Sequence, residues 1–133
     1  MQKPNWTELL KLETINQLAD AAHENAKLKG FHDSKERGET DEQFVTLHTN
    51  LLHEEVAELF SAVRTGTFNH ECDKSAKMIE LGLPALTCAE EEYADIVIRV
   101  LDQCRRLGID IQRAIQAKHG YNTTRERMHG KRF

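Results

Sequence analysis

The sequence predicts an all-α fold, a single bundle of four to five helices over residues 1–133. Of these residues, 39% are hydrophobic and 30% are charged, and the mean hydropathy is −0.61. This balance is typical of a water-exposed helical domain and not of a membrane protein or a disordered chain. Only two prolines occur, and no alternating β-branched segment is bounded by turn residues, so no sheet is expected. The length fits one domain.

The first half of the chain predicts two helices. Apolar residues recur at three- and four-residue steps over residues 5–29, and Gly30 is a natural end for this first helix. The polar stretch of residues 30–40 is predicted to be a loop. A second helix is expected over about residues 41–66, because acidic residues at its start interact favourably with the helix dipole.

The second half predicts an insert and two further helices. Residues 66–86 are expected to be irregular or to contain a short helical piece over about residues 74–81. The T-x-x-E capping box at residues 87–90 predicts that a third helix begins there and ends near residue 107. A last helix is expected over about residues 111–127, and residues 128–133 form a basic tail.

Charge is divided unevenly along the chain. The net charge is −4, but residues 105–133 contain eight Lys and Arg against two acidic residues, a net charge of +6, which leaves −10 on the first 104 residues. An acidic body with a basic end suits the binding of cations and phosphates, or else a self-complementary surface. The basic segment lacks the interleaved aromatic residues of single-strand binders, so nucleic acid is not an expected partner.

The cysteines and the apolar runs predict the compartment. Three cysteines without a C-x-x-C pair argue against a disulfide framework and a structural zinc site. The N-terminus has no apolar signal region, and no aliphatic run approaches the roughly 20 residues that cross a bilayer. We therefore expect a cytoplasmic protein without a membrane partner.

Two acidic motifs lie on the predicted second and third helices, E-E-V-A-E at residues 54–58 and E-E-Y-A-D at residues 91–95. Each contains two carboxylates three residues apart, which a helix places on one face about a turn apart. A helical wheel puts the first pair inside an apolar stripe and the second pair at the border of one. The pairs are Glu55 with Glu58 and Glu92 with Asp95.

Burial of these four carboxylates needs compensation, because an ionised carboxylate without a partner is costly in an apolar interior. Basic side chains or metal ions would supply it, and an all-oxygen set suits Mg²⁺, with Mn²⁺ as a substitute. No Cys or His lies at ligand spacing, which disfavours zinc, and the Glu-x-x-His pairs of di-iron bundles are absent. The alternative is that both acidic faces are solvated.

The acidic motifs resemble the E-x-x-E … E-x-x-D signature of the MazG-like all-α nucleoside triphosphate pyrophosphohydrolases. The similarity continues through D-I-V-I-R-V-L-D at residues 95–102, L-G-I-D at 107–110, K-x-x-Y-N-x-x-R at 118–125 and H-G-K-R-F at 129–133. It covers most of the chain, from about residue 30 onwards. The insert lengthens the gap between the two acidic motifs beyond that of many short members.

This resemblance implies an activity and a set of roles. The expected reaction is Mg²⁺-dependent hydrolysis of a (deoxy)nucleoside triphosphate to the monophosphate and pyrophosphate, with nucleotide-pool cleansing as the expected role. Glu54 or Glu91 would accept the proton of the attacking water or orient a ligand. The implied metal ligands are Glu55, Glu58, Glu92 and Asp95. The implied phosphate contacts are Lys118 and Asn122, with Arg125 or Lys131.

Recognition of the nucleobase is expected from a few rings and one cation. The candidates are Phe31, His32, Arg99 and Trp6. Each has a plain structural alternative: the two apolar rings as core caps, His32 as a loop residue and Arg99 as a counter-ion of the carboxylates. The histidines on helices, His23, His48 and His53, are expected to be incidental.

The predicted second helix is apolar over much of its circumference, which one protomer does not cover. We therefore expect a homodimer or a tetramer built from dimers, centred on the second and third helices. The resemblance points the same way. The competing hypothesis for function is a non-catalytic helical module that binds a nucleotide or regulates a partner.

Overall fold

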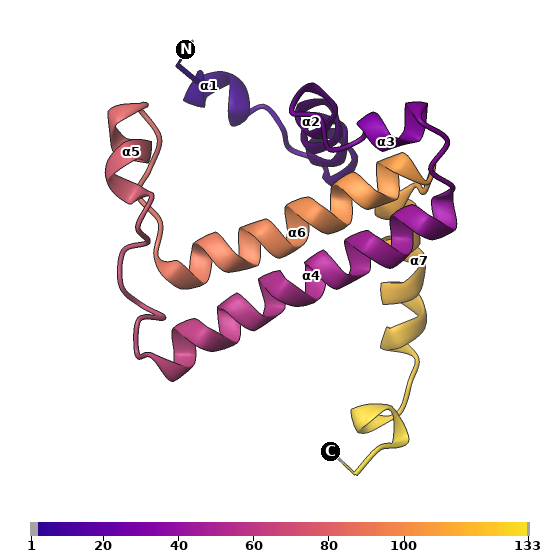
Figure 1. Ribbon diagram of the computed structural model, residues 1–133. Coiled ribbons are helices and arrows are strands. Elements are labelled where there is room, and N and C mark those ends of the chain that lie inside the picture. The colour runs from indigo at the N-terminus through magenta and orange to yellow at the C-terminus, as the bar shows by residue number, and fades with distance from the viewer. Residues whose placement is uncertain (1–2, 133) are drawn as a thin grey trace.

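The computed structural model describes residues 3–132, and over these residues the fold is all-α, as predicted (Figure 1). Four helices are long and three are short, and no strand forms in the described chain beyond one isolated bridge between Glu71 and Thr87. The elements are α1 (Trp6–Leu9), α2 (Ile15–Leu28), α3 (Asp33–Glu36), α4 (Asp41–Arg64), α5 (Ser75–Glu80), α6 (Cys88–Arg106), α7 (Ile111–Thr123) and the 3-10 helix η1 (Arg127–Gly130).

The centre of the molecule is the pair α4 and α6, which pack side by side, with α2 lying across α6 (Figure 1). α4 and α6 correspond to the predicted second and third helices. The capping box predicted at residues 87–90 is also present. The Glu90 amide donates to Thr87 Oγ1 over 3.2 Å, and the Thr87 amide donates to Glu90 Oε2 over 2.8 Å.

The single helix predicted over residues 5–29 is wrong. α1 ends at Leu9, and a second capping box starts α2: the Gln17 amide donates to Thr14 Oγ1 over 3.1 Å, and the Thr14 amide donates to the Gln17 side chain over 2.9 Å. Apolar spacing continues through residues 10–14, but a residue whose side chain satisfies the free amides of a new first turn begins a new helix there.

Other predicted bounds also need correction. The polar stretch of residues 30–40 contains the short helix α3 and is not a continuous loop. The last helix ends at Thr123 instead of 127, and the tail then forms η1, in which Met128 and His129 have a positive φ of 54°. Residue 133 of the predicted tail lies outside the described residues.

The predicted insert, residues 66–86, is ordered by hydrogen bonds within itself and to the start of α6. Ser75 is buried and donates through Oγ to the Leu86 carbonyl over 2.9 Å, while the Leu86 amide donates back to Ser75 Oγ over 3.1 Å. The Cys88 amide donates to the His70 carbonyl over 2.8 Å. These bonds fix the insert, including the helix α5, against the end of the α4–α6 pair.

The buried part of the chain is small and unusually polar. The buried apolar residues are Ala19, Phe44, Ala62, Cys72, Ala89 and Leu101. The buried polar residues are His32, His48, Glu55, Ser75, Glu91, Asp102 and Arg106. Within the described residues, no helix has the length and apolar character that crossing a membrane requires.

Candidate functional site

Three of the four predicted metal ligands come together between α4 and α6. One carboxylate oxygen from each of Glu55, Glu58 and Glu92 lies within 4.8 Å of the other two. Glu55 is only 8% exposed, as the helical wheel predicts, but Glu58 is exposed, so its predicted burial is wrong. Both residues are on α4, but Glu58 borders an open hollow, whereas Glu55 accepts a hydrogen bond from Arg99 of α6. We call these three residues the carboxylate cluster.

Glu92 is the member of the carboxylate cluster that most needs a cation. Its Oε2 atom is buried and has no hydrogen-bond partner among the described residues. Burial, together with the nearby charges of Glu58, Glu91 and Asp95, raises the pKa of Glu92 to about 7. A buried oxygen without a donor and surrounded by like charge fits a bound divalent cation.

Asp95, the fourth predicted ligand, is not one of the three mutually close carboxylates. It is half-buried one turn along α6 from Glu92. Burial raises its pKa, the charges of Glu55 and Glu91 add to that rise, and Lys74 and Arg99 oppose it. Asp95 therefore shares the electrostatic field of the cluster and is placed to complete its ligand set.

Two basic side chains already compensate part of this charge. Arg99 donates through Nε to Glu55 Oε1 over 2.5 Å, and Lys74 of the insert donates to the buried Glu91. The hydrogen bond to Glu91 raises the pKa of Lys74. Glu91 is thus held next to the cluster by an ion pair, while Glu54, the other candidate proton acceptor, is exposed and outside the cluster.

These carboxylates line two separate cavities. The first, of about 210 Å³, lies between α2, α4 and α6, is bordered by Glu55 and Asp95, and is called the α2–α6 cavity here. The second, of about 600 Å³, is bordered by Glu58 and Glu92 and by Lys74 of the insert, and is called the insert cavity. A ligand bound in both cavities would pass directly over the carboxylates.

The predicted phosphate-binding set does not reach this site within one chain. α7 contacts α2 and projects away from the α4–α6 pair (Figure 1). The Lys118 ammonium lies 4.7 Å from the centre of the Tyr121 ring, and Arg125 Nη1 lies 3.0 Å from His129 Nδ1. None of the four residues borders either cavity: Lys118, Asn122, Arg125 and Lys131.

The four nucleobase candidates separate into two groups. Phe31, 54% exposed, and Arg99 both border the α2–α6 cavity. His32 is buried and does not border the cavity, but it contacts Asp102, which does. Trp6 lies on α1 and borders neither cavity, so the structure does not bring it to the site.

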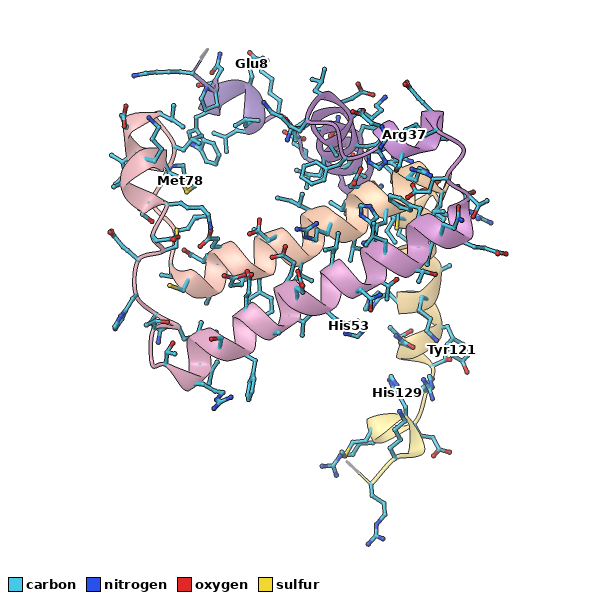
Figure 2. The ribbon with its side chains drawn as sticks, in the orientation of Figure 1. Glu8, Arg37, His53, Met78, Tyr121 and His129 are labelled. Atoms are coloured by element: carbon cyan, nitrogen blue, oxygen red, sulfur yellow. The ribbon has the colours of Figure 1, made fainter. Side chains whose placement is uncertain are left out.

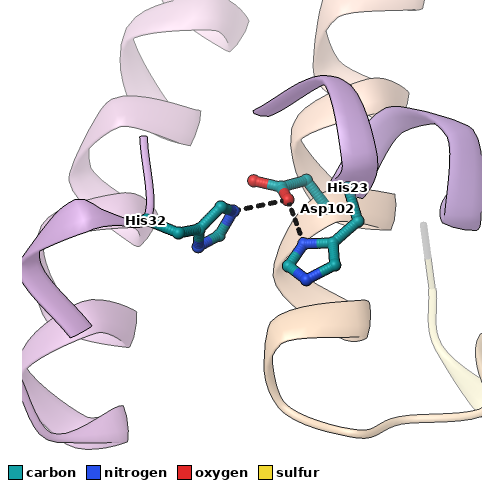
Figure 3. A group of neighbouring side chains, drawn as sticks. All are labelled: His23, His32 and Asp102. Atoms are coloured by element: carbon teal, nitrogen blue, oxygen red, sulfur yellow. Dashed lines mark hydrogen bonds and ion pairs between the residues drawn. The ribbon is translucent and has the colours of Figure 1, made fainter. Parts of the chain in front are cut away.

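A cluster of histidines around Asp102, shown in Figure 3, was not predicted from the sequence. His23 Nδ1 and His32 Nε2 donate to the same atom, Asp102 Oδ1, over 2.8 Å and 2.7 Å. Arg106 Nη1 lies 3.5 Å from His32 Nδ1, and arginine only donates, so the proton of His32 is on Nε2. Both histidine donors and Asp102 Oδ1 thus have partners in this network without a cation.

Two of the three histidines expected to be incidental are therefore part of the site's surroundings. His23 holds Asp102, and His48 borders the α2–α6 cavity and stacks on Phe44 at 4.0 Å between ring centres. Burial lowers the pKa of His48. His53 is exposed and points away from α6 (Figure 2).

A spacing signal for these residues was present in the sequence. His48 precedes Glu55 by seven residues on α4, and Asp102 follows Asp95 by seven residues on α6. Residues seven apart share one helix face. A search two turns before the first acidic motif and two turns after the second would therefore have found His48 and Asp102.

Comparison with known proteins adds no match: no protein-family model, no curated protein and no solved structure matches this chain. The resemblance of its acidic motifs to the MazG-like pyrophosphohydrolases therefore stays a prediction. The site is interpreted from its own geometry and chemistry.

Proposed function

We propose that this protein is a Mg²⁺-dependent nucleoside triphosphate pyrophosphohydrolase, which cleaves between the α- and β-phosphates. The observation that supports this most directly is the carboxylate cluster, in which Glu92 has a buried oxygen without a partner beside the oxygens of Glu55 and Glu58. Such a set suits Mg²⁺, which binds carboxylates, keeps waters and recruits phosphate oxygens. The triphosphate is strongly anionic, so only cations reconcile it with this acidic site.

The residues present could divide the chemistry between them. A bound Mg²⁺ would supply Lewis acidity at the phosphoryl group and a water of lowered pKa. In the hydrolysis, the water oxygen bonds to the α-phosphorus, and the α–β bridging oxygen leaves with the bonding electrons on pyrophosphate. The proton of the water passes to a carboxylate. Glu91 borders the insert cavity together with Glu58, whereas Glu54 borders neither cavity, so Glu91 is the better-placed acceptor.

The two cavities suggest how the substrate lies. The α2–α6 cavity would hold the base, and the terminal phosphates would extend over the carboxylates into the insert cavity, near Lys74. Lysine acts as a point charge toward phosphate oxygens. Phe31 and Arg99 are then the nucleobase neighbours among the predicted candidates, with Trp6 left outside.

We also propose self-association, as a homodimer or a tetramer of dimers. α4 exposes an apolar surface that α6 does not cover, formed by Val45, Val56, Phe60 and Val63. Apolar patches of this kind on a helix mark protein contacts. A second copy could then bring the basic residues of its α7 and tail to the phosphates, which one chain alone does not. The cytoplasm, where triphosphates and Mg²⁺ occur together, is the compartment we propose.

One observation favours the second hypothesis, a non-catalytic nucleotide-binding or regulatory module. Arg99 pairs with Glu55 and Lys74 pairs with Glu91, so the protein neutralises two of its own acidic groups. An acidic site compensated in this way can bind a ligand without hydrolysing it.

Pyrophosphate release separates the two hypotheses. We expect wild-type protein to release pyrophosphate from at least one of a panel of ribo- and deoxynucleoside triphosphates with Mg²⁺. Glu58→Gln should abolish release, because it removes a proposed metal ligand. Glu58 is exposed, so the substitution should leave the fold intact. Glu42→Gln, an exposed change near the start of the same helix, is the matched control and should keep full activity. Nucleotide binding without turnover in the wild type would favour the module instead.

A further inference from the structure

The α2–α6 cavity has two chemically different ends. Glu55 and Asp95 border the end next to the carboxylate cluster, and Asp102 and His48 border the other end. Asp95 and Asp102 are seven residues apart on α6, about 10 Å along the helix axis. A ligand that reaches the cluster from this cavity therefore extends its far edge toward Asp102.

The walls between these ends are largely apolar. They are formed by Ala22 and Ala26 of α2, by Phe31 between α2 and α3, and by Ile98 of α6, and the polar residues Asn25 and Arg99 also border the cavity. Its volume of about 210 Å³ is below the roughly 300–1,000 Å³ of pockets that enclose drug-sized ligands. A slot of this size with apolar walls suits one flat ring, with the sugar and phosphates outside it.

Asp102 presents a hydrogen-bond acceptor to this slot. The side chain is held by His23 and His32, which both donate to Oδ1, and no described residue donates to Oδ2. Asp102 is only 7% exposed and still borders the cavity. No protein donor occupies Oδ2, so an N–H group of a ligand in the cavity could donate to it.

We propose that the α2–α6 cavity binds cytosine, with Asp102 accepting a hydrogen bond from the exocyclic amino group. This deepens the proposed function and rests on it: the substrate becomes a cytidine or deoxycytidine triphosphate. Carboxylates accept from cytosine N4, whereas uracil and thymine place an oxygen at that position. That oxygen is an acceptor, as the carboxylate is, so these bases would leave both groups unsatisfied. The small volume disfavours adenine, which also has an amino group but two rings.

The direct test compares dCTP with dUTP, which match in ring size, sugar and phosphates and differ in the group at position 4. We expect wild-type kcat/KM to be at least about ten-fold higher for dCTP, because sites built to bond a donor reject the analogue without it. It should also exceed that for dATP. Equal values for dCTP and dUTP, or a preference for dATP, would overturn the proposal.

Two variants test whether Asp102 causes the preference for dCTP over dUTP. Asp102→Asn should bring the dCTP-to-dUTP ratio to about one or below, because the amide oxygen stays with the two histidines and the NH₂ group then faces the base as a donor. Asp20→Asn is the control: Asp20 is on α2 next to Arg105, borders neither cavity and should keep the wild-type ratio. If Asp102→Asn does not fold, as circular dichroism would show, the wild-type ratio decides the matter alone.

Equilibrium binding of dCMP and dUMP, measured by titration calorimetry, separates this inference from the proposed function. Tighter binding of dCMP with no triphosphate cleaved would support cytosine recognition and contradict the hydrolase. Cleavage of triphosphates with equal binding of dCMP and dUMP would support the hydrolase and contradict cytosine recognition.

Discussion

Glu58 on α4 and Glu92 on α6 bring carboxylate oxygens within 4.8 Å of each other across the helix pair. Glu92 Oε2 is buried and has no donor among the described residues, so the contact is one of like charges in a desolvated place. Such a contact is stable only when a proton or a cation lies between the oxygens. The first two predictions follow from this requirement.

The stability of the metal-free protein should fall as the pH rises through the range in which Glu92 titrates. Its pKa is raised from 4.5 to about 7 by burial and by Glu58, Glu91 and Asp95, with Glu55 also close by on α4. The folded protein therefore binds this proton more tightly than the unfolded chain does. The resulting stabilisation is complete below pH 4.5 and is lost as the pH rises to about 7.

Glu92→Gln isolates this effect, because glutamine does not titrate. In EDTA, the melting temperature of Glu92→Gln should exceed that of the wild type more at pH 8 than at pH 5, measured by thermal unfolding. For Glu54→Gln, an exposed change on α4, the melting temperature should differ from that of the wild type by the same small amount at pH 5 and at pH 8. A difference for Glu92→Gln that does not depend on pH would contradict the explanation.

Divalent cations should stabilise the folded protein. A ligand that binds only the native state at a hundred times its dissociation constant adds about 2.7 kcal/mol, which raises the melting temperature by several degrees. We expect this rise with MgCl₂ at pH 8 and a much smaller one in Glu58→Gln. Choline chloride at equal ionic strength is the control for salt screening. An equal effect of both salts would show that the acids are merely solvated.

Arg99 should be important for stability even without substrate. It is the hydrogen-bond partner of the buried Glu55, so Arg99→Met leaves that carboxylate without its donor. We expect the free energy of unfolding to fall by about 1–3 kcal/mol in urea denaturation. The double variant Arg99→Met with Glu55→Gln should regain most of this loss. Arg113→Met, an exposed change on α7, should alter stability by less than about 0.5 kcal/mol.

Local chemistry explains which parts of the fold were predictable. The T-x-x-E box at residues 87–90 gave the start of α6 correctly, because the two side chains and two amides that form it are adjacent in sequence. The same chemistry at Thr14 and Gln17 was overlooked, since the apolar spacing runs through the break. At Thr14 the capping box and the apolar periodicity disagree, and the capping box determines where the helix starts.

Long-range contacts explain what was missed in the site. The pairing of Glu55 and Glu58 with Glu92 was predictable, because each motif lies on one helix and only the packing of two helices was required. Asp102 is 79 residues from His23 and 70 from His32, so their contact depends on how α2 and the following segment return to α6. Likewise, Lys74 reaches Glu91 only through the fold of the insert.

The most direct test of the metal site is a crystal of the protein grown with MnCl₂ and measured near the manganese absorption edge. We predict anomalous density between the carboxylates of Glu55, Glu58 and Glu92, with oxygen ligands at about 2.0–2.6 Å. If those side chains instead point into bulk solvent with no anomalous density between them at millimolar manganese, the carboxylate cluster is not a cation site.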